Sequence, residues 1–119
     1  MSIYKTSVTN IGADAEMFVA EEMIILFGEN APDDLKDYVY NIVVTPLNGE
    51  ISPGQSLLID GEAFEITAVG NVVGQNLEQL GHITLKFDGS KQAELPGTLY
   101  LESKSVPVLQ ENSTLEIIA

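Results

Sequence analysis

Apolar and polar residues alternate along several short stretches of this chain, with the two-residue period of strands that have one buried face. In the stretch 82–88, Ile83, Leu85 and Phe87 alternate with polar neighbours. Asp60 and Gly61 suit a type I′ turn, so 56–59 and 62–69 form the clearest hairpin, with Phe64 and Ile66 facing the core. The full set of predicted strands covers residues 2–10, 23–27, 38–45, 56–59, 62–69, 82–88, 98–101 and 113–118.

Two stretches have the pattern of short helices. In 72–80, Leu77 and Leu80 share one face, and Gly81 stands where a left-handed residue ends a helix. Residues 30–37 have a capping Asn30, an early proline and acids in the first turn. Residues 15–20 fit either a helical turn or a loop.

Seven or eight short strands with tight turns and two short helices predict a mainly β fold. We expect a small closed or partly open barrel, rich in antiparallel pairs, or a sandwich. A parallel α/β sheet would need longer crossover helices. The length of 119 residues predicts a single domain over residues 1–119.

Charge narrows the range of partners. Eighteen acidic residues against five lysines give a net charge of −13, so we expect a basic protein partner rather than nucleic acid or an anionic membrane. The chain has no arginine for a phosphate clamp and no cysteine for disulfides, thiol catalysis or Cys-based zinc sites. No apolar run approaches the length of a membrane span and the first ten residues lack a secretory signal, so we expect a cytoplasmic protein without membrane insertion.

His82 is the sole histidine, on the polar face at the start of the 82–88 strand. It could act as a nucleophile, a general base or a metal ligand, or lie at the barrel rim bonded to backbone. Lys86 shares its face, but four strand residues place the two Cα atoms roughly 13 Å apart. Asp33 and Asp37, four apart on the predicted helix, could hold a cation or be solvated helix-end charges.

The run Gly81-His82-Ile83-Thr84-Leu85-Lys86-Phe87-Asp88-Gly89 closely resembles the glucitol/sorbitol-specific IIA component of the phosphoenolpyruvate-dependent sugar phosphotransferase system. Further matching stretches are 11–13, 31–35, 53–54, 67–70, 76–77, and 94 with 96–98. The resemblance implies a cytoplasmic phosphocarrier that accepts a phosphoryl group from HPr on a histidine and passes it to the IIB component during sugar uptake. It implies no nucleotide or cofactor, and it names HPr and the sugar-specific IIB/IIC components as partners. We predict no metal site.

The family places its phosphoryl-accepting histidine in a His-x-His pair after the Ala-Pro-x-Asp-Leu helix. In this chain the pair falls on Ile42 and Val44, neither of which can accept phosphate. We therefore take His82 as the candidate phosphoryl acceptor. The alternative is a phosphotransfer-inactive binding or regulatory relative, and a glycan-binding barrel is a third reading. Exposed strand edges would also allow a homodimer.

Overall fold

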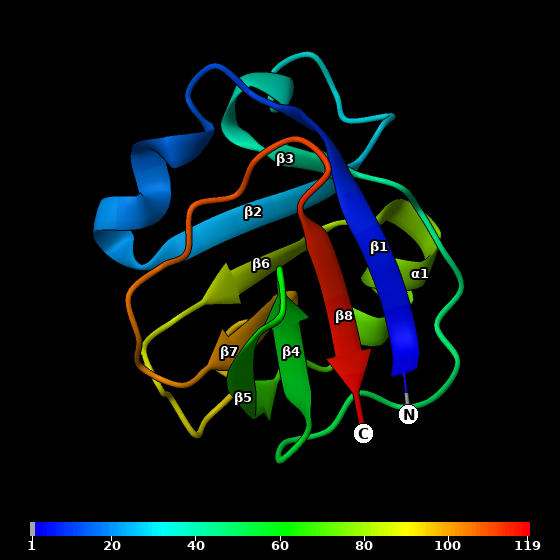
Figure 1. Cartoon of the computed structure of the whole chain (residues 1–119), viewed down its shortest axis with the longest axis vertical. Coiled ribbons are helices and arrows are strands. Elements are labelled where there is room, and N and C mark those ends of the chain that lie inside the picture. Colours follow the sequence, from blue (N-terminus) through cyan, green and yellow to red (C-terminus); the bar gives the residue numbers. More distant parts are fainter. Residues whose placement is uncertain (1) are drawn as a thin grey trace.

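The computed structural model describes residues 2–119, whose strands close into a barrel (Figure 1). Around the barrel the strands follow the order β1-β3-β2-β6-β7-β5-β4-β8. The mainly β class and the closed barrel are confirmed. The strands are β1 (Ser2–Ile11), β2 (Met23–Gly28), β3 (Tyr40–Ile42), β4 (Ser56–Ile59), β5 (Glu62–Val69), β6 (Ile83–Lys86), β7 (Thr98–Leu101) and β8 (Thr114–Ile118).

Most neighbouring strands run antiparallel, as predicted, but the sheet is mixed. Between residues 2 and 119, six strand pairs are antiparallel, and β2–β3 and β6–β7 are parallel. Loops 29–39 and 87–97 make the parallel connections without an α-helix. The closed ring leaves no free sheet edge in this part of the chain, which removes the edge argument for a homodimer.

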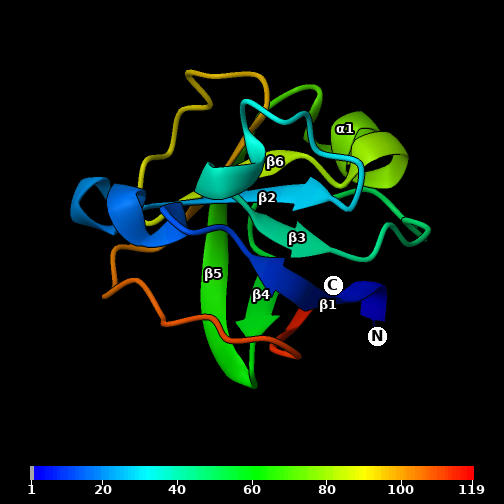
Figure 2. The same cartoon turned by 90° about the horizontal axis from the view of Figure 1, so that it is seen from above.

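The helices lie outside the barrel. The α-helix α1 (Val73–Leu80) leads into β6, whereas the 3₁₀ helices η1 (Ala15–Glu21) and η2 (Lys36–Tyr38) flank β2. The views in Figures 1 and 2 agree that η1 and α1 lie on opposite sides of the barrel. The predicted helix 72–80 is confirmed, and residues 15–20 belong to η1.

Alternate apolar residues of the strands fill the barrel. The side chains of Phe64 and Ile66 are fully buried, as the hairpin pattern predicted. Phe64 meets Phe87 edge to face, with ring centroids 5.3 Å apart. Asp60 and Gly61 have the positive φ angles, 50° and 87°, that a type I′ turn requires.

The predicted helix over residues 30–37 is wrong. The carbonyl of Pro32 accepts hydrogen bonds from the amides of Leu35 and Lys36, and only the single 3₁₀ turn η2 follows. Val39 is already extended, so too few residues remain to offset the cost of starting a helix. Asp33 and Asp37 therefore do not share a helix face, and residues 2–119 contain no group of three potential ligand residues of the kind that holds a metal ion.

The predicted strand 38–45 is shorter than expected. Only Tyr40–Ile42 forms β3, and Ile42 is fully buried. The next two side chains, Val43 and Val44, remain 38% and 44% exposed. The apolar run 42–44 is therefore buried at Ile42 only. None of the helices within residues 2–119 has the length and apolar character to span a membrane.

Candidate functional site around His82

His82 occupies the junction between α1 and β6. Gly81 ends the helix in the left-handed conformation, with φ of 66°, and its amide donates to the Leu77 carbonyl. The His82 amide donates to the Asn76 carbonyl at 3.3 Å. These two bonds close the last turn of α1 and fix the backbone of His82 at the mouth of β6.

Two glycines let this junction lie directly on the end of β2. A Cβ atom on Gly81 would come within 3.0 Å of the Gly28 nitrogen. A Cβ atom on Gly28 would meet the Leu80 carbonyl oxygen at 2.6 Å and Val44 Cγ2 at 2.7 Å. Side chains at either position would push the helix end away from the strand. Glycine at both positions therefore brings His82 against β2.

The imidazole of His82 stacks on Phe27. The ring centroids are 4.2 Å apart and the planes differ by 15°. The antiparallel register pairs Leu26 with Ile83, so the next step of the ladder brings Phe27 and His82 together on the outer face. Phe27 is only 8% exposed, which makes its ring a fixed platform for the imidazole.

The rest of the imidazole has no polar partner. Within residues 2–119, neither ring nitrogen forms a hydrogen bond, and neither is sealed from solvent. Partial burial lowers the pKa of His82 from its usual value of 6.5, so the ring is neutral at physiological pH. A neutral imidazole offers a nitrogen lone pair, the form required of a nucleophile.

Lys86 does not take part in this site. Its ammonium group donates to the backbone carbonyl of Glu21 at 2.9 Å. The Lys86 ammonium group therefore contacts the end of η1.

A cavity of about 240 Å³ is lined by Phe27, although not by His82 itself. Phe27 belongs both to this cavity and to the stack with His82. Two of the other apolar wall residues, Val44 and Leu80, are among the more exposed large apolar side chains described, at 44% and 48%. The lining residues are Phe27, Gly28, Glu29, Asn30, Pro32, Val44, Gln79 and Leu80.

The positions of the His-x-His pair lie close to His82 in the fold. Ile42 Cγ1 would be 3.4 Å from a Cβ atom on Gly81, the residue before His82. Ile42 itself faces the interior, whereas Val44 forms a wall of the cavity. Sequence reasoning treated His82 and positions 42 and 44 as separate features, and it missed the stack with Phe27. Both strands were predicted, 23–27 from a continuous apolar run and 82–88 from alternation, but the register between them was unknown.

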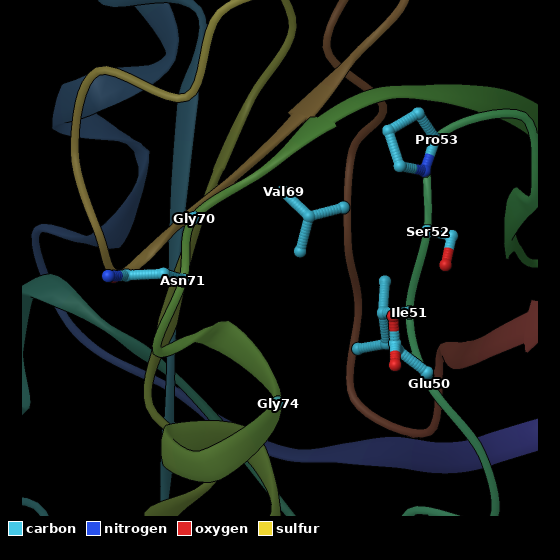
Figure 3. A pocket seen from close by; sticks show the side chains of 8 residues that line it. All are labelled: Glu50, Ile51, Ser52, Pro53, Val69, Gly70, Asn71 and Gly74. Carbon is cyan, nitrogen blue, oxygen red and sulfur yellow. The ribbon is translucent and has the colours of Figure 1, made fainter.

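A second cavity, of about 340 Å³, lies between the loop 50–53 and the segment joining β5 to α1 (Figure 3). Glu50, Ser52 and Asn71 are its polar side chains. Figure 3 shows Asn71 pointing away from the space between Val69 and Ile51, so the polar groups do not converge. Neither His82 nor its stacking partner Phe27 lines this second cavity.

The family model described as PTS system glucitol/sorbitol-specific IIA component matches residues 3–116. The chain belongs to this family. Two glucitol/sorbitol-specific EIIA components, from Shigella flexneri and Escherichia coli (strain K12), are each 41% identical over 99 residues, which is 83% of this chain and 80% of theirs.

A solved structure has a similar fold. The crystal structure of a PTS system IIA component from Enterococcus faecalis V583 superimposes with a TM-score of 0.81 at 26% identity. The match covers 98% of this chain and all of the Enterococcus chain. The family resemblance seen in the sequence is therefore confirmed.

Proposed function

We propose that this IIA protein is a cytoplasmic phosphocarrier that accepts a phosphoryl group from HPr on His82 and passes it to the IIB component during sugar uptake. Family membership supports the carrier role. The observation that supports His82 as acceptor is its neutral, partly exposed imidazole, held on Phe27 with both nitrogens free of hydrogen bonds among the described residues.

The chemistry requires one bond to form as another breaks. A lone pair on a His82 ring nitrogen forms the new P–N bond while the P–N bond of phosphorylated HPr breaks, and the released electron pair stays on the donor's imidazole. Transfer to IIB repeats the exchange with His82 as the leaving group. Because His82 is neutral, no proton has to leave the attacking nitrogen before the bond forms.

The proposed site must stabilise phosphate without an arginine. The imidazole of His82 is partly exposed, so water can solvate the phosphoryl group. Hydration suits a group that is held briefly and then passed on.

Incubation with phosphoenolpyruvate, enzyme I and HPr should label the protein with an acid-labile, alkali-stable phosphoryl group. His82→Ala should abolish the label. The matched control is Thr84→Ala, which truncates the next side chain on the same face of β6 and should label like the wild type. An unlabelled wild type, or label that survives in His82→Ala, would overturn the proposal.

A phosphotransfer-inactive binding module is the second candidate, motivated by Ile42 and Val44 at the pair positions. Family membership does not favour it over the carrier. Saturable HPr binding to an unlabelled wild type would support it.

A further inference from the structure

We propose that the cavity of about 240 Å³ lined by Phe27, the stacking partner of His82, holds an apolar side chain of the phosphoryl donor protein. A cation next to that side chain pairs with Glu29. This inference rests on the proposed function, because it specifies how the donor is held at the same site. The occupant is a side chain of a basic protein of the HPr type.

The walls of the cavity have the composition of an anchor pocket. Pro32, Val44 and Leu80 surround it with Phe27, and the exposed fractions of Val44 and Leu80 leave much apolar surface in contact with water. Covering such surface is favourable in proportion to the area removed from water. Apolar side chains that fill a central pocket carry most of the affinity in many protein interfaces.

Phe27 connects the proposed docking cavity to the reacting imidazole of His82. Phe27 lines the cavity, and the face of its ring carries the imidazole of His82. A donor side chain in the cavity would therefore be held on the same rigid group as the acceptor nitrogen. Such positioning replaces a bimolecular encounter by a reaction between groups already in place.

The negative charge around the cavity favours a basic protein, rather than a second copy of this chain, as the occupant. Glu29 lines the cavity, and Asp33 and Asp34 follow in the same loop, where Lys36 lies 3.8 Å from Asp33. Two copies would each bring a net charge of −13 to the contact. A partner with basic residues around its own histidine would be attracted instead.

Val44 gives this pocket an apolar wall where the family resemblance assigns a histidine. The resemblance assigns a histidine to position 44, and here a valine forms part of the apolar wall. The geometry therefore gives position 44 a docking role in this protein.

The test compares two phosphoryl donors. Phosphorylated HPr must dock, whereas phosphoramidate is small and reacts directly: its P–N bond breaks, the new P–N bond forms on His82, and ammonia leaves. Leu80→Asp and Val44→Asp place a charge on the cavity wall. Val108→Asp makes the same change at a residue that is 72% exposed, in the connection from β7 to β8 across the barrel from α1 (Figure 1).

We expect Leu80→Asp and Val44→Asp to lower kcat/KM for phosphorylated HPr by about tenfold or more. Their labelling by phosphoramidate should stay within about twofold of the wild type, and Val108→Asp should behave like the wild type with both donors. Wild-type rates for Leu80→Asp with HPr, or an equal loss in all three variants, would overturn the docking proposal.

If the proposed function is wrong, the result differs from all of these, because the wild type takes no label from either donor. Methyl NMR of His82→Ala then decides the docking proposal separately. Addition of unphosphorylated HPr should shift the Val44 and Leu80 methyl signals and leave those of Val108 unchanged. No shift at Val44 and Leu80, or a wild-type dimer in sedimentation that Leu80→Asp dissociates, would refute the docking proposal.

Discussion

The imidazole of His82 and the ring of Phe27 are stacked, with centroids 4.2 Å apart and planes inclined by 15°. The stack orients the imidazole, whose ring nitrogens have no hydrogen-bond partner within residues 2–119. The acceptor proposed here is therefore oriented by packing and kept neutral by partial burial.

Replacing Phe27, on which the imidazole stacks, should raise the pKa of His82. Phe27→Leu keeps an apolar side chain of similar size and should cost less than about 1.5 kcal/mol of stability. Because the aromatic face that shields the imidazole is lost, the His82 midpoint should move up towards 6.5. NMR titration of the imidazole carbon-bound protons measures the midpoint. A wild-type midpoint at or above 6.5, or a lower midpoint in the variant, would contradict this explanation.

Stability should depend on pH through His82. Its folded-state pKa lies below the unfolded value, so the unfolded chain binds more protons as the solution is acidified. The contribution of His82 is fully present above about pH 6.5 and is lost as the pH falls through the folded-state pKa.

Urea unfolding of the wild type and His82→Gln from pH 7.5 to pH 5 isolates this contribution, since the carboxylate contributions cancel in the difference. We expect the wild type to lose stability relative to the variant on acidification. A constant difference, or one of opposite sign, would count against the pKa direction.

Gly81→Ala should destabilise the protein. At a φ of 66°, any residue with a Cβ atom is destabilised by about 1–2 kcal/mol. The alanine Cβ atom would also lie 3.0 Å from the Gly28 nitrogen. Chemical unfolding measures the loss, and the variant's His82 signals should also move because the helix end shifts. Gly89→Ala is the control, because its φ of 70° is similar but its Cβ position lies no closer than 3.4 Å to a neighbouring atom. Equal losses in the two variants would show that the contact with β2 contributes nothing.

Tyr4→Phe should be neutral or stabilising by up to about 1 kcal/mol. The Tyr4 hydroxyl is buried without a hydrogen-bond partner in the described chain, and burial raises its pKa. The neighbouring Thr6 and Thr45 hydroxyls donate instead to the carbonyls of Val43 and Lys5. Thr6→Val, which removes a 2.6 Å bond, is the contrast and should cost about 1 kcal/mol. A clear loss of stability in Tyr4→Phe, measured by urea unfolding, would show that the hydroxyl is bonded.

Local patterns were sufficient for elements that depend on neighbouring residues. The Asp60-Gly61 turn, the helix ending at Gly81 and the alternation from Ile83 to Phe87 all have short-range causes and are present in the structure. The failed helix at 30–37 also had local signals, but the chain has to become extended by Val39 to enter β3.

The site itself could not be predicted in full. The stack requires the β2–β6 register, and the approach of Gly81 to Gly28 requires α1 to lie on the end of β2. Both are long-range relations that no local pattern encodes. His82 was found because it is the sole histidine, whereas Phe27 looked like any other residue of a buried strand.

The most direct test of the central claim is ¹⁵N NMR of the imidazole before and after incubation with phosphoenolpyruvate, enzyme I and HPr. If His82 carries the phosphoryl group, one of its ring nitrogen signals will shift and show coupling to phosphorus, and the change will reverse when IIB is added. Unchanged His82 ring nitrogen signals in the presence of phosphorylated HPr would contradict the account.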